Sequence, residues 1–335
     1  MYRRAVATAP GKVTLFGEHA VVYGHPALVA AISRRVRVVV ERLDEPKLVV
    51  SSSNLPVRGL NLELRGEEIR AAVDTRLALR LLSYVLEALG VVDQHLGAEE
   101  RPGLRITIDS DMPVSAGLGT SASITVATIA AYSALRGEEL KRETIARLGH
   151  MVEKRVQGAA SPMDTAIATH GGLLVVEPGR SPPYKVLEAA SPPLVIGYTP
   201  REGTTAELVA RVRMLRERYP DLIDLVMESI GRLTRRALDE LLAGRLDSLG
   251  ELMDMNHSLL RALGVSTKKL DDMVNAAKVA GALGAKLTGA GGGGSMIALC
   301  PEGLRSHVEA SIRAVGGSII EANTGGEGVR VESLE

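Results

Sequence analysis

The chain has 335 residues, of which 45% are hydrophobic and 24% charged, and its 40 basic and 40 acidic side chains give a formal net charge of zero. A neutral chain has no general attraction to nucleic acid or to an anionic membrane. Only 2% of the residues are aromatic, which disfavours the stacking surfaces that bind single-stranded nucleic acid.

The sequence also predicts where the protein resides. Cys300 is the one cysteine and cannot form an internal disulfide, which favours a reducing compartment. The opening MYRRAVATAPGK has no long apolar run behind its arginines and is unlike a secretory signal. No apolar stretch approaches the ~18–20 residues that a bilayer-spanning helix needs. We therefore expect a cytoplasmic protein without a membrane partner.

The first half of the chain alternates strand and helix patterns. Three β-branched or alternating segments predict strands, the first of them short and followed by a turn: 5–16, 35–43 and 47–51. Helical spacing of apolar residues predicts a helix over 75–89, with Gly90 as its stop. A strand over 104–108 then leads to a largely apolar helix over 121–135 and an amphipathic helix over 141–156.

Two Pro-Pro pairs within residues 178–193 break regular structure and indicate a domain boundary. We therefore expect an N-terminal domain over 1–185 and a C-terminal domain over 186–335. The second begins with a mainly helical region over 205–263. Its remaining pattern predicts, in order, a helix over 267–282, strands over 285–288 and 295–300, a helix over 303–315, and strands over 318–322 and 328–333. That order suggests an α+β fold with helices on one face of a sheet.

The most informative motif is PVSAGLGTSASITVA, residues 113–127, where a predicted strand runs into glycines and a helix follows at once. Gly117 and Gly119 can adopt positive φ and let a ligand approach the backbone closely. The N-terminus of the following helix presents free N–H groups and a partial positive charge, which suits phosphate. The hydroxyls of Thr120 and Ser121 can cap the helix, bind phosphate oxygens or ligate Mg2+.

Three alternatives compete for this motif. An ordinary glycine turn with Ser/Thr capping would account for the segment taken alone. A P-loop is excluded, because no Gly-Lys-Ser/Thr sequence follows. Gly117, Gly119 and Ala122 match the GxGxx(G/A) pattern of dinucleotide-binding folds, which expect a second strand ending in an acidic residue about 20 positions on. The next segment is another predicted helix, so a dinucleotide-binding fold is disfavoured.

Two more glycine motifs lie near the ends of the sequence. Lys12 follows Pro10-Gly11, and Glu18-His19 come shortly after; alone, these would usually be surface residues. Four consecutive glycines stand within KLTGAGGGGSMIAL, residues 286–299. Each glycine is costly to order, and apolar predicted strands flank the run on both sides. We therefore expect a loop that closes over a ligand there.

Two acidic residues lie between these motifs. Glu153 stands near the end of the amphipathic helix, and Asp164 on a predicted turn after Ser161-Pro162. A lone acidic residue is usually solvent-exposed. Phosphoryl transfer, however, needs a metal ligand and a group that orients or deprotonates the attacking hydroxyl, and these two carboxylates could fill those roles.

Together the three glycine motifs resemble the GHMP kinases, a family that includes kinases of galactose, homoserine, mevalonate and phosphomevalonate. The family has a PGK-like segment, a PxxxGLGSSA loop and a TGAGGGG segment, which appear here at residues 10–12, 113–122 and 288–294. The segment KVTLFGEHAVVYGHPAL and residues 253–271 are most similar to the mevalonate kinase branch, of archaeal type.

This resemblance implies an α+β fold with two domains: an N-terminal α/β domain with a left-handed βαβ-type phosphate loop, and a ferredoxin-like C-terminal domain. It implies Mg2+-dependent transfer of the γ-phosphoryl group of ATP to the C5 hydroxyl of mevalonate, a step of isoprenoid biosynthesis. The implied partners are the small molecules ATP and mevalonate, with no nucleic acid, and the family is compatible with a homodimer.

The resemblance also implies roles for individual residues. Asp164 matches the aspartate beside the substrate hydroxyl, and Lys12 the lysine that contacts this aspartate and the reacting oxygens. Ser121 and Glu153 match the two Mg2+ ligands. The implied ATP-binding residues are Pro113, Ser115, Ala116, Gly117, Leu118, Gly119, Thr120, Ser121 and Ala122. The implied substrate-binding residues are Lys12, Glu18, His19, Asp164, Thr288, Gly289, Ala290 and Gly291.

One position departs from the family pattern, since Thr120 replaces the first serine of GLGSSA, although it retains the hydroxyl. Two alternatives stay open beside the dinucleotide-dependent enzyme. One is another GHMP kinase, acting on phosphomevalonate, on the 3-hydroxyl of mevalonate or on a sugar. The other is a non-catalytic GHMP-fold sensor, which would be expected to lose its catalytic acid or metal ligands.

Overall fold

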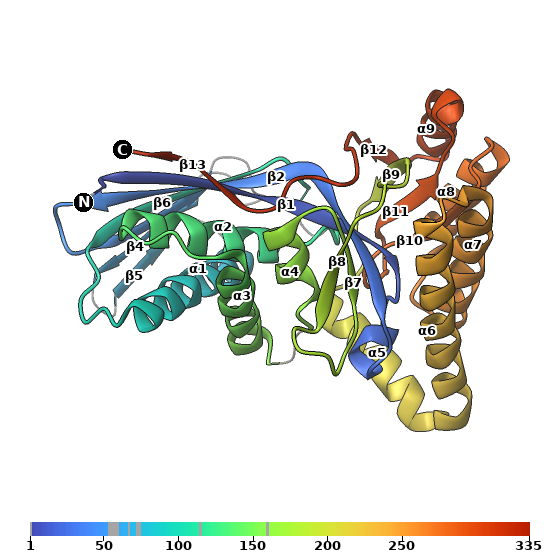
Figure 1. The fold of residues 1–335 in the computed structure, drawn as a ribbon, viewed down its shortest axis with the longest axis horizontal. Coiled ribbons are helices and arrows are strands. Elements are labelled where there is room, and N and C mark those ends of the chain that lie inside the picture. The colour runs from blue at the N-terminus through green and yellow to red at the C-terminus, as the bar shows by residue number, and fades with distance from the viewer. Residues whose placement is uncertain (1, 53–59, 66–67, 72–74, 114–115, 159–160) are drawn as a thin grey trace.

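The computed structural model describes residues 2–335 apart from 53–59, 66–67, 72–74, 114–115 and 159–160. The described strands form two sheets. The larger follows the order β13-β1-β2-β6-β3-β4-β5, with β7 pairing with β2 and β8 with β7, and the smaller follows the order β10-β11-β9-β12. Figure 1 shows them as the two ends of an elongated molecule. This confirms the expected two-domain fold of mixed helices and sheets.

The larger sheet is built on two long strands. These are β1 (Arg4–Phe16) and β2 (Ala27–Leu43), which pair in antiparallel fashion. The register shifts between Pro10 and Lys12, so the Pro-Gly-Lys segment forms an irregularity inside a strand and not a turn after a short one. The other strands of this sheet are β3 (Leu48–Ser52), β4 (Leu60–Arg65), β5 (Glu68–Ala71), β6 (Gly103–Ser110), β7 (Leu173–Val176), β8 (Tyr184–Leu187) and β13 (Arg330–Leu334).

Helices cover one face of this sheet (Figure 1). They are α1 (Thr75–Leu96), α2 (Thr120–Leu135), α3 (Arg142–Gln157) and α4 (Met163–His170). From Ala122 onward every residue of α2 is buried, as its apolar sequence predicts. Gly90 does not end α1, which was predicted to stop there. Val91 and Val92 pack into the core, and their burial outweighs the ~1 kcal/mol that glycine costs inside a helix.

The second domain is helical first and mixed afterwards, as expected. Its helices are α5 (Thr205–Arg218), α6 (Pro220–Leu242), α7 (Leu246–Ala262), α8 (Lys268–Val279) and α9 (Arg305–Ala314), with short 3-10 turns at Ala20–Tyr23 (η1, in the first domain) and Glu302–Leu304 (η2). Its strands are β9 (Leu194–Thr199), β10 (Gly284–Leu287), β11 (Gly294–Leu299) and β12 (Ser318–Ile320). Within the described part of the chain, none of the helices combines the length and the apolar character that crossing a bilayer requires.

The last strand returns to the first domain. β13 pairs with β1, so that Ala5 lies opposite Leu334. The division of the chain at residue 185 stays a prediction, but the segment 186–335 contributes its final strand to the larger sheet. Pro192 and Thr324, on the two segments that cross between the sheets, are joined by a hydrogen bond of 2.6 Å from the threonine hydroxyl to the proline carbonyl.

The hydrophobic core is continuous between the domains. The larger cluster of buried apolar residues runs from β1 and β2 to Ile196 on β9, Met253 on α7 and Ile297 on β11. A second cluster lies between the smaller sheet and α5 to α9. Because apolar side chains bridge the two domains, the groups that face each other across the interface are held in a defined position.

Candidate active site

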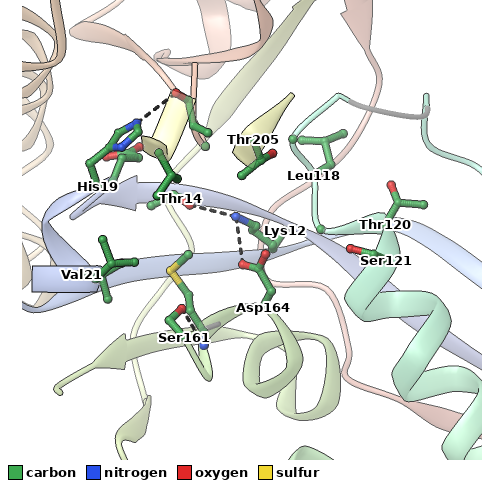
Figure 2. Close-up of a pocket in the computed structure, with 18 of the residues that line it drawn as sticks. Lys12, Thr14, His19, Val21, Leu118, Thr120, Ser121, Ser161, Asp164 and Thr205 are labelled. Carbon is green, nitrogen blue, oxygen red and sulfur yellow. Dashed lines mark hydrogen bonds and ion pairs between the residues drawn. The ribbon is translucent and has the colours of Figure 1, made fainter. Parts of the chain in front are cut away.

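A cleft of about 270 Å³ opens between the domains. Figure 2 shows the end of β1 and the first turns of α2 and α4 around it. Sequence-predicted residues make up about half of its lining: Lys12, Glu18, His19, Gly117, Leu118, Gly119, Thr120, Ser121, Asp164, Gly289 and Ala290. The fold therefore brings all three glycine motifs and Asp164 to one place.

The predicted phosphate loop lies at one end of this cleft. Gly117 and Gly119 have φ angles of +81° and +75°, in the left-handed region that favours glycine. Gly119 is the N-cap of α2, and among the described residues no side chain caps this end of the helix. The free N–H groups and partial positive charge therefore remain available to an anion. This geometry disfavours the alternative of an ordinary Ser/Thr-capped turn.

Not every predicted ATP-binding residue borders the cleft. Ala116 and Ala122 are buried and Pro113 is half-buried, and the lining of the cleft does not include them. The carbonyl of Ala116 instead accepts a hydrogen bond of 2.9 Å from the hydroxyl of Ser295, which fastens the loop to the second domain. Ser115 lies outside the described residues.

Lys12 and Asp164 form an ion pair at the centre of the cleft (Figure 2). The Lys12 ammonium lies 3.1 Å from a carboxylate oxygen of Asp164 and 3.1 Å from the hydroxyl of Thr14. Lys12 is buried, and its backbone N–H donates to the carbonyl of Leu118 over 2.8 Å, which ties β1 to the phosphate loop. Asp164 lies in the first turn of α4, and not on the turn predicted for it.

Glu153 lies on α3 close enough to this pair to interact with it electrostatically. Burial raises the pKa of its carboxyl well above the ordinary value, and the neighbouring Asp164 raises it further, against the opposing effect of Lys12. Two carboxyl groups near one ammonium suit a divalent cation, which would favour the ionised form of both. The described residues contain no group of three or more acidic, histidine or cysteine side chains arranged around a metal. Ser121 lines the cleft, whereas Glu153 is buried and is not among the residues that line it.

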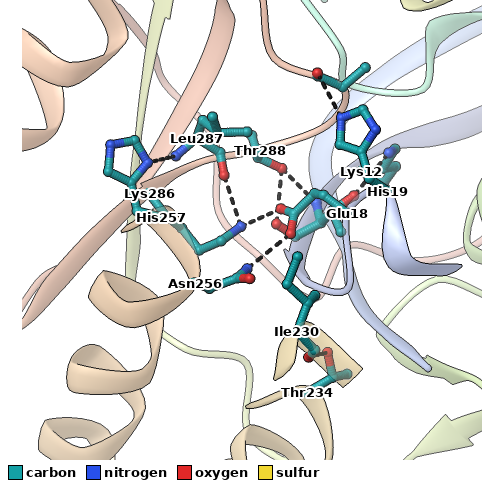
Figure 3. A network of polar contacts seen from close by, with 12 residues as sticks. Lys12, Glu18, His19, Ile230, Thr234, Asn256, His257, Lys286, Leu287 and Thr288 are labelled. Atoms are coloured by element: carbon teal, nitrogen blue, oxygen red, sulfur yellow. Dashed lines mark hydrogen bonds and ion pairs between the residues drawn. The ribbon is translucent and has the colours of Figure 1, made fainter. Parts of the chain in front are cut away.

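Glu18 and His19 lie where β1 ends and η1 begins. Both oxygens of the Glu18 carboxylate already accept hydrogen bonds, one from Lys286 and one from the Asn256 amide at 3.1 Å (Figure 3). His19 has a φ of +60°, and its Nε2–H donates to the carbonyl of Ala290 over 3.0 Å. Burial lowers the pKa of its imidazole, so the ring is neutral near pH 7.

The glycine-rich segment between β10 and β11 packs against the phosphate loop. Gly289 and residues 291–294 all have positive φ. A side chain on Gly291 would place its Cβ 2.1 Å from the carbonyl oxygen of Val265, and one on Gly293 would place it 2.4 Å from that of Pro200. Close contacts within the protein therefore require glycine at these positions. The sequence analysis had explained the glycines by a loop that closes over a ligand, and it did not predict these contacts.

Sequence reasoning missed several residues of this region. Arg201 lines the cleft, and its guanidinium donates to the hydroxyl of Thr205 over 2.9 Å. The guanidinium also lies next to Gly117 of the phosphate loop, since a Cβ on that glycine would be 3.4 Å from it. Its neighbour Thr204 forms a capping box with Glu207, and the motif Thr-x-x-Glu could have located the start of α5 at the cleft. Lys286 and Asn256 carried no comparable signal.

Family models match both halves of the chain. The GHMP kinases N terminal domain matches residues 83–172, and the GHMP kinases C terminal domain matches residues 237–317. The galactokinase galactose-binding signature also matches, over residues 2–42. These matches include the phosphate loop, Asp164 and the glycine-rich segment.

Mevalonate kinases are among the most similar proteins. That of Thermococcus sibiricus is 44% identical over 336 residues, which cover 99% of each chain. The crystal structure of the Methanococcus jannaschii mevalonate kinase has a TM-score of 0.79 at 32% identity, covering 98% of each chain. That of the L. major mevalonate kinase in complex with R-mevalonate has a TM-score of 0.78 at 28% identity and covers 96% of this chain and 95% of the other.

Proposed function

Because this chain belongs to the mevalonate kinases of the GHMP kinase family, we propose that it transfers the γ-phosphoryl group of ATP to the C5 hydroxyl of mevalonate. The products would be 5-phosphomevalonate and ADP. The observation that carries the proposal is the Lys12–Asp164 pair, 3.1 Å apart in a cleft whose other end is the uncapped N-terminus of α2.

The phosphate loop would hold the triphosphate of ATP. The backbone of Gly117–Ser121 and the N-terminus of α2 offer N–H donors and a partial positive charge. Lys12 adds a full positive charge at the edge of the same surface. Since phosphoryl transfer passes through a loose transition state, positioning and charge neutralisation would supply most of the catalysis.

Ser121 and Glu153 would hold Mg2+. The hydroxyl of Ser121 faces the cleft, and the buried Glu153 carboxyl beside Asp164 is the kind of hard oxygen ligand that Mg2+ prefers. When bound, the metal would neutralise charge on the phosphate oxygens. Its presence would also keep Glu153 ionised despite its burial.

Asp164 would orient the acceptor hydroxyl and take its proton. Its side chain is 31% exposed and lines the cleft, so a substrate hydroxyl can reach it, while Lys12 holds its position. His19, Gly289 and Ala290 would contact the rest of the acceptor, since all three border the cleft. Thr288 and Gly291 do not border it, and the Thr288 hydroxyl is bonded to the Thr14 backbone instead. A cytoplasmic location and a homodimer stay predictions.

The direct test is ADP release in a coupled assay with ATP, Mg2+ and mevalonate, followed by NMR of the product. Phosphorus–carbon coupling at C5 is the expected result, and phosphorylation of the 3-hydroxyl or no turnover would overturn the proposal. Galactose belongs in the same panel, because the galactose-binding signature matches residues 2–42, where Glu18 and His19 lie. Faster turnover of galactose than of mevalonate would favour a sugar kinase.

A further inference from the structure

A buried polar network lies at the edge of the cleft, where residues of the two domains meet (Figure 3). Its centre is Lys286 on β10, whose side chain has no exposed surface, paired with Glu18, whose side chain is 1% exposed. Long charged side chains are rarely buried to this degree without a partner. A completely buried ammonium in the second domain, held by an acid of the first, therefore requires an explanation.

The pair itself and most of its contacts join the domains. The Lys286 ammonium donates to one oxygen of Glu18 and to the carbonyl of Leu287 over 2.8 Å, and lies 6.0 Å from the centre of the Phe16 ring. The amide of Asn256, on α7, donates to the other oxygen of Glu18 over 3.1 Å. The end of β1 is thereby fixed to α7 and β10.

These contacts leave Glu18 poorly suited to bind the acceptor directly. Both of its carboxylate oxygens accept hydrogen bonds from the protein, and a second carboxylate, such as that of mevalonate, would be repelled by it. A positioning role for Glu18 accounts for its burial, whereas the family resemblance implies substrate contact.

The backbone of β10 and a set of hydrogen bonds connect Lys286 to the catalytic pair. Thr288, two residues along, accepts from the backbone N–H of Thr14 over 2.8 Å and donates to the Thr14 carbonyl over 2.9 Å. The Thr14 hydroxyl lies 3.1 Å from the Lys12 ammonium, which in turn holds Asp164. The position of β10 relative to β1 thus determines where Lys12 lies.

We propose that Lys286 is a positioning residue: its buried ion pair with Glu18 holds the second domain against β1 so that Thr288 and Thr14 place Lys12 beside Asp164. This inference rests on the proposed function, since it assigns a role within the same reaction. Breaking one partner of such a pair leaves an uncompensated buried charge, whereas removing both charges is often tolerated.

The test is a double-mutant cycle of Lys286→Met, Glu18→Gln and the combined variant. We expect Lys286→Met to lower kcat by about 10²-fold, because a displacement of about 1 Å in a catalytic site can cost that much. The combined variant should recover about tenfold of the loss, since no charge is then left unpaired. If Glu18 instead bound mevalonate, both variants that carry Glu18→Gln would raise the KM for mevalonate, and the two single effects would multiply without recovery.

A matched control is Lys268→Met, which breaks a Lys–Asp pair whose lysine is 88% exposed; it should leave kcat within about twofold. Thermal unfolding of the wild-type chain and the three variants of the cycle gives a second readout that needs no activity. The combined variant should unfold at a higher temperature than Lys286→Met, and an equal or lower temperature would overturn the inference.

Two outcomes separate this inference from the proposed function. A wild-type chain that is inactive with mevalonate refutes the proposed function. The unfolding temperatures of the four chains still show, in that case, whether the buried ion pair couples Lys286 to Glu18. If Lys286→Met does not fold, Asn256→Ala keeps the ion pair and removes one hydrogen bond to Glu18. It should lower kcat with an unchanged KM for mevalonate, and a raised KM with an unchanged kcat would contradict the positioning role.

Discussion

Replacing Asp164 by asparagine removes the negative charge that faces Lys12 and the base proposed for the acceptor hydroxyl. The side chains have nearly the same shape, so the first turn of α4 should be retained. We expect kcat to fall by about 10²–10⁴-fold, as is usual when a general base is lost. The KM for ATP should change little, because the phosphate loop and Lys12 remain.

The structure gives the strength of the contact that the substitution removes. At 3.1 Å and an effective dielectric constant of about 20, the attraction between the two charges is about 5 kcal/mol. Solvent screens part of it, because Asp164 is 31% exposed. The expected loss of 10²–10⁴-fold corresponds to about 2.7–5.4 kcal/mol of transition-state stabilisation. The attraction to Lys12 acts in the ground state as well, so it accounts for how firmly Asp164 is held, whereas the rate loss reflects the missing proton acceptor.

The same substitution changes the charge around Glu153. Asp164 raises the pKa of Glu153, so its loss should lower that pKa and leave the metal requirement unchanged or smaller. The assay is single-turnover phosphorylation of mevalonate with a Mg2+ titration at saturating ATP. Near-normal turnover of Asp164→Asn would refute the role of Asp164 as general base. A large increase in the Mg2+ requirement would show that its carboxylate binds the metal instead.

Three further variants test other parts of the protein. Glu153→Gln should raise the Mg2+ concentration at half-maximal rate about tenfold or more, and an unchanged titration would count against a metal ligand there. Arg201→Met should raise the KM for ATP about tenfold if the guanidinium reaches phosphate, and an unaltered KM would remove it from the site. Burial lowers the pKa of His257 to about 4, so the unfolded chain takes up a proton between pH 6.5 and 4 that the folded chain does not. Stability should therefore fall by up to about 3 kcal/mol over that range, and urea unfolding of His257→Gln should show a smaller fall; equal falls would contradict this.

Local signals in the sequence were sufficient to predict the glycine turn and the helix start at one end of the cleft, while phosphate binding there stays a prediction. Glycines followed at once by a buried helix can be recognised without knowledge of the fold, and the loop at Gly117 and Gly119 has the predicted geometry. Lys12 and Asp164 were placed together only through the family resemblance, since no local rule relates residues so far apart in the chain. The helix that carries Asp164 was missed because its eight residues show too little periodicity.

What the sequence could not predict depends on packing between distant segments. Gly90 would end an isolated helix, but the burial of its neighbours Val91 and Val92 carries α1 onward. Lys286 resembles an ordinary strand lysine until the fold encloses it with Glu18. The pairing of β13 with β1 likewise depends on the topology. The residues of β13 predict a strand, but they do not indicate which strand it pairs with.

The two segments that cross between the sheets lie together, joined through Thr324 and Pro192. The covalent connections between the domains therefore pass side by side at one point. The Thr14–Thr288 hydrogen bonds tie the same two domains together at a second place, next to the residue that contacts Lys12. The chain crossing alone consequently does not set the position of Lys12, which also depends on a non-covalent junction that single substitutions can weaken.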